Sequence, residues 1–139
     1  MREWGGKSAL RWDCNSQGCH NVKGRPKLLA FSDCFPGRIS LSDIDATAEI
    51  EGRFLFMEWK GIGAPLSVAQ EIYHKKLTSL APGKILSVIV EGDPQTMAVR
   101  SVRVIRCGRV GPSEPCDLET LRARIRRWAT WAKGARAAA

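Results

Sequence analysis

The sequence predicts a single α/β domain, because strand-like and helix-like segments follow one another along its 139 residues. Residues 43–50 and 53–60 alternate apolar and polar side chains with the period of two that is typical of half-buried strands. Residues 117–133 carry apolar residues at helical spacing instead, on one stripe of Leu118, Leu121, Ile125, Trp128 and Ala132. A chain of this length forms one domain and is large enough to bury a core.

The first elements follow from these patterns and from the turn residues between them. Residues 27–34 are predicted to form a short helix or an irregular segment, closed by Pro36-Gly37. A first strand begins at about Ile39 and a second at about Phe54. Residues 67–80 are predicted to form a helix, whose apolar side would hold Ala69, Ile72, Tyr73, Leu77 and Leu80.

The later elements complete the α/β pattern. The nearly all-apolar run from Lys84 to Val90 is typical of a central strand that is covered on both faces. Residues 97–106 alternate again and predict another strand, and the helix of residues 117–133 follows it. Strands and helices therefore interleave, as they do in α/β proteins.

The first two strands are predicted to pair as a hairpin with Glu51-Gly52 as its two-residue turn. This register places Asp45 directly opposite Glu58 and Asp43 opposite Lys60, with opposed Cβ atoms roughly 4.5–5.5 Å apart on one face. Two carboxylates this close repel each other unless a cation lies between them, and oxygen ligands suit Mg²⁺ or Mn²⁺. Lys60 would then stabilise an attacking hydroxide or the charge that develops on a phosphate.

The ordered set Asp45, Glu58, Lys60 and Gln70 resembles the PD-(D/E)xK nuclease superfamily, with Ile44 in place of the proline of that name. Within the superfamily the chain is most similar to VRR-NUC domains and archaeal Holliday-junction resolvases. This similarity covers about residues 38–106, including 54–60, 61–70 and the apolar strand around 85–90. The resemblance implies a restriction-endonuclease-like core, with a mixed central sheet flanked by helices.

The same resemblance implies a metal-dependent nuclease that acts on DNA. Asp45, Glu58 and the backbone carbonyl of Trp59 would bind Mg²⁺ or Mn²⁺, with Asp43 as a further ligand. Lys60 would orient the nucleophile. Gln70, which opens the helix after the Glu-x-Lys strand in those families, would position the water or a phosphate oxygen. The resemblance also allows a homodimer, in which two sites meet two strands.

Simpler interpretations of these residues remain open. Glu58 and Lys60 could lie on a solvated strand face, with Asp43 and Asp45 as ordinary polar residues at a strand entry. Such a face would not normally carry two phenylalanines in the same row as Glu58.

The first turn of the helix at residues 67–80 also has two interpretations. Ser67 and Gln70 fit a capping box, in which each side chain accepts a backbone N–H from the other residue. Gln70 could serve both as a cap and in the site. His74 lies one turn later on the same face and is expected to be a surface or phosphate-contacting residue rather than a ligand.

The charge of the chain favours a polyanionic partner. Lys and Arg number 22 against 14 Asp and Glu, which gives a net charge of +8 and a pI near 9.7. The last helix carries four arginines off its apolar stripe, and we predict that they contact nucleic acid: Arg122, Arg124, Arg126 and Arg127. The alternative is an amphipathic helix that packs on the sheet and exposes a solvated basic face.

Residues 1–37 are predicted to be a basic, Cys-containing segment that precedes a nuclease-like domain of residues 38–139. Cys14, Cys19, His20 and Cys34 could complete a tetrahedral Zn²⁺ site, and reduced thiols are the alternative in a cytosolic chain. Two functions other than catalysis follow from these features. One is a non-catalytic nucleic-acid-binding module on the nuclease fold, and the other is a zinc-stabilised adaptor for a protein partner.

The sequence predicts no membrane partner. No apolar run approaches the roughly 20 residues that span a bilayer. Residues near Trp4 include Arg2, Glu3 and Lys7, so the apolar core of a signal peptide is missing there. We therefore expect a cytoplasmic protein.

Overall fold

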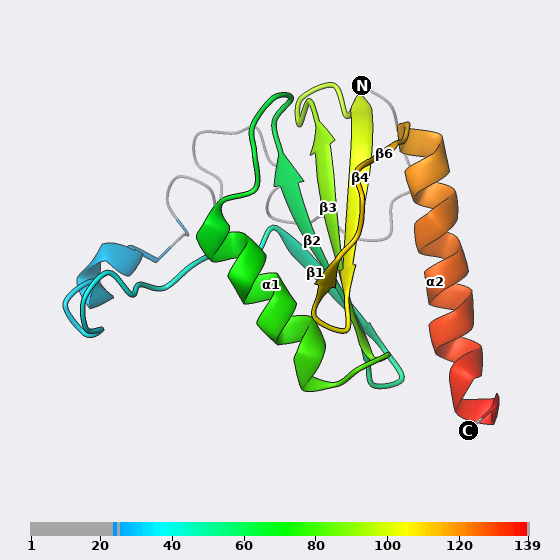
Figure 1. The fold of residues 1–139 in the computed structure, drawn as a ribbon, viewed down its shortest axis with the longest axis horizontal. Helices are drawn as coiled ribbons and strands as arrows, with labels where there is room; N and C mark the ends of the chain where they lie inside the picture. The colour runs from blue at the N-terminus through cyan, green and yellow to red at the C-terminus, as the bar shows by residue number, and fades with distance from the viewer. Residues whose placement is uncertain (1–23, 25, 139) are drawn as a thin grey trace. The chain divides into compact units, whose positions relative to one another are not determined.

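The computed structural model describes residues 24 and 26–138, and the chain divides into two compact units, Met1–Ser42 and Asp43–Ala139. In the first unit, the described residues include a short 3-10 helix, Leu28–Phe31, in the segment predicted to be a short helix or irregular. The second unit contains the sheet and the α-helices (Figure 1). Its elements are β1 (Ala46–Ile50), β2 (Arg53–Lys60), α1 (Val68–Leu80), β3 (Ile85–Gly92), β4 (Val99–Arg106), β5 (Arg109–Val110), β6 (Glu114–Pro115) and α2 (Leu118–Ala138).

The described strands form one mixed, six-stranded sheet. β1 pairs antiparallel with β2, β2 pairs parallel with β3, and β3 pairs antiparallel with β4, which also pairs with β5 and β6. The parallel pair needs a crossover connection, and α1 supplies it. An α/β fold with a mixed sheet and flanking helices is therefore confirmed. β5 and β6 were not predicted, because two residues are too few to show a periodicity.

The β1–β2 hairpin has the predicted turn and register. Glu51 and Gly52 have φ angles of 50° and 78°. A type I′ turn needs positive φ at both of these positions. Ile50 then faces Arg53, and the ladder continues from this pair without a bulge.

The start of β1 differs from the prediction, because the strand begins at Ala46 and not at about Ile39. The carboxylate of Asp45 explains the difference. Its Oδ2 accepts the backbone N–H of Trp59 at 2.6 Å. In a longer strand a backbone carbonyl of β1 would accept this N–H, so the side chain ends the ladder.

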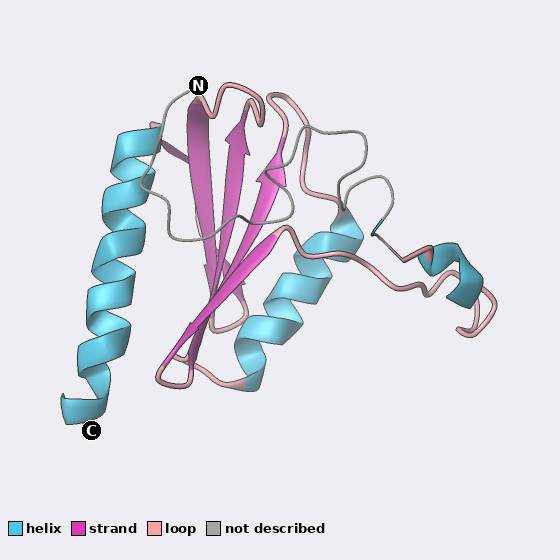
Figure 2. Ribbon diagram, turned by 180° about the vertical axis from the view of Figure 1, so that it is seen from behind, coloured by secondary structure: helices cyan, strands magenta, loops and turns pink. Residues whose placement is uncertain are grey.

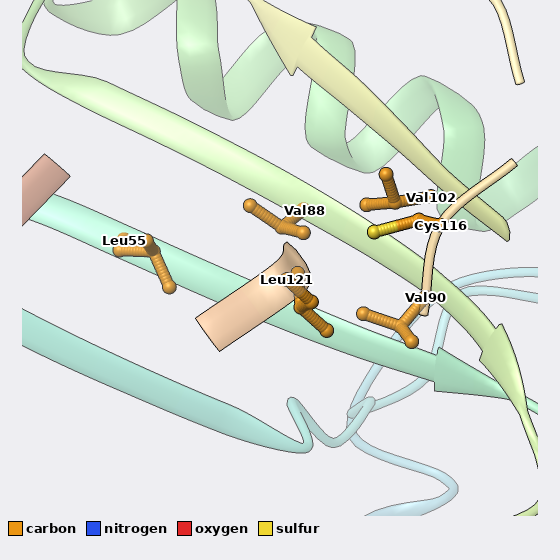
Figure 3. Close-up of a cluster of buried hydrophobic side chains, with 6 residues drawn as sticks. All are labelled: Leu55, Val88, Val90, Val102, Cys116 and Leu121. Atoms are coloured by element: carbon orange, nitrogen blue, oxygen red, sulfur yellow. The ribbon is translucent and has the colours of Figure 1, made fainter. Parts of the chain in front are cut away.

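The two α-helices of the second unit cover opposite faces of the sheet (Figures 1 and 2). On the α2 face, Leu55, Val88, Val90 and Val102 of the strands pack with Cys116 and Leu121 (Figure 3). Ile125 and Trp128 pack against this cluster and Ala132 is fully buried, so the predicted stripe of α2 is confirmed. In the described part of the chain, no helix is both long and apolar enough to cross a membrane.

α1 begins after its predicted N-cap, Ser67, but it packs through a different side from the predicted one. Ile72 and Tyr73 are 46% and 44% exposed, whereas His74 and Thr78 are buried. Most of the buried groups are hydrogen-bonded, since the Thr78 hydroxyl donates to the His74 carbonyl at 2.8 Å and His74 Nδ1 lies 2.7 Å from Ser87 Oγ of β3. These contacts let a polar stripe face the sheet at low cost.

Candidate active site

Asp45 and Glu58 lie together where the β1–β2 hairpin opens. The observed register, extended by one pair beyond β1, places them directly opposite each other. In this hairpin the pair falls at a non-hydrogen-bonded position, where opposed side chains lie closest. Glu58 is only 5% exposed and Asp45 is half-buried. The two carboxylates therefore meet in a region that water reaches poorly.

This environment raises the pKa of Glu58 from the usual 4.5 to about 7. Burial is the largest cause, followed by the negative charge of Asp45 and by a hydrogen bond between the two carboxyl groups, which the protonated Glu58 donates. The charge of Lys60 opposes the shift, and that of Asp43 adds to it. Ionising both acids is thus costly in the protein alone, and a cation between them would remove that cost.

Lys60 lies on the same sheet face as Glu58, two residues further along β2. Its ammonium group is close enough to lower the pKa of both Glu58 and His74. Lys60 also lines a cleft of about 240 Å³, together with Glu91 and Arg103 of the neighbouring strands. Beside the cleft, Glu91 accepts the backbone N–H of Gly63 at 3.0 Å and so anchors the connection between β2 and α1. Lys60 therefore faces a space that a solvent molecule or a phosphate group can enter.

The donor groups fit a hard divalent cation that keeps part of its water shell. Asp45 and Glu58 supply two carboxylates, and the Trp59 carbonyl points to the same strand edge as the Trp59 N–H that Asp45 binds. Asp43 is exposed. Among the described residues, no group of three or more His, Cys, Asp or Glu side chains could hold a metal ion. Mg²⁺ does not need one, since it binds through one or two carboxylates, substrate phosphates and several waters.

Gln70 is the N3 residue of a complete capping box. Its backbone N–H donates to Ser67 Oγ at 3.1 Å, and its Oε1 accepts the Ser67 N–H at 3.3 Å. The capping interpretation is confirmed. Because Oε1 is used at the helix start, the amide NH₂ is the group of Gln70 that would be available to a phosphate oxygen.

His74 was misplaced by the sequence prediction, since it is 1% exposed and not at the surface. Its Nε2 lies 3.7 Å from Glu58 Oε1 and has no hydrogen-bond partner among the described residues. Burial, and then the charge of Lys60, lower the pKa of His74 and favour its neutral form. A polar stripe of Gln70, His74 and Thr78 at four-residue spacing was the sequence signal that could have revealed its position.

The four predicted nucleic-acid-binding arginines of α2 differ in their surroundings. Arg122 pairs with Glu119 at 3.3 Å, and Arg124 pairs with Glu114 at 3.1 Å. Arg126 and Arg127 are exposed, and neither forms an ion pair within the part of the chain that the structure describes. Among these four arginines, the charge that is available to a phosphate is therefore concentrated at Arg126 and Arg127.

The predicted zinc ligands are only partly within the described residues. Cys14, Cys19 and His20 lie outside them, and Cys34 is an exposed free thiol. The zinc site stays a prediction.

Comparisons with protein-family models, with curated proteins and with solved structures find no match to this chain. The chemistry of the site is therefore inferred from its own residues. Two opposed carboxylates, a lysine on the same face and an adjacent cleft can together bind a divalent cation and a phosphate group.

Proposed function

We propose that this protein is a divalent-metal-dependent nuclease that hydrolyses phosphodiester bonds in DNA, on a restriction-endonuclease-like core with a PD-(D/E)xK site. The observation that supports this most is the contact between Asp45 and the buried Glu58, with Lys60 next on the same face. A buried acid with a raised pKa next to a second carboxylate, as Glu58 is, destabilises the fold by itself. Such an arrangement is common at functional sites, where a bound cation or a reaction makes use of it.

Mg²⁺ or Mn²⁺, when bound, would lower the pKa of a water molecule and neutralise the phosphate. Asp45 and Glu58 would hold the cation, together with the Trp59 carbonyl. Asp45 is already oriented for this, because its Oδ2 accepts the Trp59 N–H at 2.6 Å. Lys60 would donate a hydrogen bond to the attacking oxygen or to the phosphate, and so stabilise the negative charge that develops there.

The charge of the chain supports DNA as the substrate. The net charge of +8 favours contact with a phosphate backbone. The cleft that Lys60 and Arg103 line offers room for one phosphate group beside the lysine. Arg126 and Arg127 would bind the backbone elsewhere and hold the duplex without reading its sequence. We expect selectivity for the structure of the DNA, as the resemblance to junction resolvases implies.

The test is a cleavage panel with Mg²⁺ or Mn²⁺ on single-stranded, duplex, flapped and four-way-junction DNA. Asp45→Asn and Glu58→Gln keep the side-chain shapes but remove charges that hold the cation, so each should reduce cleavage to background while DNA binding survives. Lys60→Ala should reduce turnover with little change in metal affinity. Glu49→Gln, at an exposed acid of β1, is the matched control and should cleave like the wild type.

The alternative is a non-catalytic nucleic-acid-binding module. It is favoured by the net charge of +8, which supports binding to a phosphate backbone whether or not the site is catalytic. It predicts salt-dependent binding with no cleavage of any substrate in either metal. Full cleavage by both Asp45→Asn and Glu58→Gln would show instead that the activity does not use these residues.

A further inference from the structure

His74 adds a buried residue to the site that the nuclease pattern does not include. It lies on α1 against the face of the sheet that carries Glu58, and its ring is 1% exposed. One ring nitrogen, Nδ1, lies 2.7 Å from Ser87 Oγ, and the other, Nε2, lies 3.7 Å from Glu58 Oε1. Ser87, His74 and Glu58 thus form a line from β3 through α1 to β2.

We infer that His74 is a positioning residue for Glu58. Ser87 selects the His74 tautomer that carries its proton on Nε2, and this N–H holds Glu58 Oε1. The other carboxylate oxygen of Glu58 then faces the cation. This inference rests on the proposed metal site. Ligating carboxylates are commonly held in this way by a hydrogen bond from a neighbouring group.

The tautomer follows from the burial of all three groups. A neutral imidazole carries its proton on one nitrogen only. If Nδ1 carried it and donated to Ser87, the lone pair of Nε2 would face the oxygen of Glu58 at 3.7 Å, and the two would repel each other once a bound cation keeps Glu58 ionised. If the Ser87 hydroxyl donates to Nδ1, the proton is on Nε2 and points at the carboxylate. Only the second arrangement directs a donor at the carboxylate.

The position of the ring is set by both α1 and β3. Ser87 is 0% exposed on β3, and the His74 carbonyl accepts the Thr78 hydroxyl at 2.8 Å within α1. The rings of Tyr73 and His74 pack edge to face, with their centroids 5.3 Å apart. The Nε2 to Oε1 distance of 3.7 Å exceeds that of a hydrogen bond. We expect it to shorten to about 2.9 Å, an ordinary N–H···O length, when Glu58 is ionised and binds the cation.

Two substitutions separate the roles of the two ring nitrogens. His74→Asn keeps a polar group near the position of Nδ1, facing Ser87, but removes the donor toward Glu58. His74→Gln places its amide near the position of Nε2 and keeps that donor. We measure Mn²⁺ affinity by calorimetry without nucleic acid. His74→Asn should weaken Mn²⁺ binding by about 10- to 100-fold, as loss of such a supporting contact does, and His74→Gln should restore most of it.

A stability control distinguishes positioning from a general structural role. Thr78 is 0% exposed one turn further along α1, and its hydroxyl accepts the Gly108 N–H at 3.0 Å. Thr78→Val should therefore lower the melting temperature while Mn²⁺ affinity stays at the wild-type value. A role of His74 in folding alone predicts that His74→Asn behaves like Thr78→Val.

The tautomer can be observed directly by NMR, because the chain has only two histidines. Histidine-selective ¹⁵N labelling with saturating Mg²⁺, and a His20→Gln variant to assign the second signal, isolates His74. The inference predicts a neutral ring protonated at Nε2. A ring protonated at Nδ1 would overturn it.

The metal and cleavage results separate this inference from the proposed function. If the wild type binds Mn²⁺ and His74→Asn binds it equally well, the role of His74 is wrong and the nuclease proposal stands. If no DNA is cut but His74→Asn still weakens Mn²⁺ binding relative to His74→Gln, the role of His74 stands and the nuclease proposal fails. A wild-type chain that binds no divalent cation overturns both.

Discussion

Glu58→Gln should change the way in which stability depends on pH, because the wild-type carboxyl is buried against Asp45. The pKa of Glu58 is about 7 in the folded protein. Its ordinary value, which applies to the unfolded chain, is 4.5. Between these two pH values the folded protein binds more protons than the unfolded chain. Stability therefore falls as pH rises through this window, and the full loss is present above pH 7.

The size of this loss follows from the pKa difference. Each pKa unit corresponds to about 1.4 kcal/mol, so a rise from 4.5 to about 7 corresponds to about 3 kcal/mol of unfolding free energy. Glu58 is 5% exposed, so solvent screens this interaction little. Glutamine cannot ionise, and the variant should lack this component of the pH dependence. The loss is large beside the 5–15 kcal/mol that stabilises a typical domain.

The assay is urea unfolding in EDTA at several pH values from 4.5 to 8, on the wild type and on Glu58→Gln. The difference in unfolding free energy between the two proteins should change by about 3 kcal/mol in favour of the variant as pH rises. Glu49→Gln is the matched control in the same hairpin, because the Glu49 side chain accepts the Gly52 N–H at 2.7 Å and glutamine retains an oxygen acceptor there. Saturating Mg²⁺ at pH 8 should stabilise the wild type and not Glu58→Gln, because only the wild type retains the full cation site.

Parallel pH profiles for the wild type and Glu58→Gln would refute this reasoning. They would mean that Glu58 is solvated in the protein or that Asp45 does not lie against it. The hairpin would then be a solvated edge that carries acids, and the proposed cation site would lose its main physical support.

Three further predictions concern other parts of the chain. Gln70→Ala should lower the unfolding free energy by about 1 kcal/mol, as loss of a capping contact does. It should cost less cleavage activity than Lys60→Ala. Equal loss of activity in the two variants would give Gln70 a direct role in the reaction. Replacing Arg126 and Arg127 by Ala should weaken DNA binding and its salt dependence more than replacing Arg122 and Arg124. The reason is that ion pairs already partly neutralise Arg122 and Arg124. Equal effects of the two double substitutions in a salt titration would contradict this. Protein purified without added metal should contain about one zinc per chain if the cysteine cluster binds it, and Cys34→Ser should lower that content; zinc far below one per chain would exclude the site.

Local patterns were sufficient to predict the hairpin and the start of α1. The Glu51-Gly52 turn determines which residues of the two strands face each other, because a two-residue loop leaves one register. The capping box of Ser67 and Gln70 lies within a single turn of helix. In both cases the interacting groups are close in sequence, so the sequence contains all the information that the interaction needs.

Contacts between distant residues were not predictable in this way. Asp45 ends β1 because its carboxylate reaches the N–H of Trp59, which is 14 positions away. α1 turns a polar stripe inward because the sheet presents Ser87 and Glu58 to it, whereas the apolar spacing of the helix favoured another side. Ion pairs similarly reduce the charge of Arg124, whose partner Glu114 lies outside the helix.

The sequence by itself therefore determined that Asp45 and Glu58 would be opposed, because turn type and strand period are local properties of the chain. Only the tertiary structure decided that Glu58 would be buried and that His74 would lie beside it. Because β2 and β3 are parallel, α1 must cross between them, and it packs on the sheet face that carries Glu58. Burial beneath a helix makes Glu58 costly to ionise beside Asp45, and in the proposed function a bound cation would remove this cost.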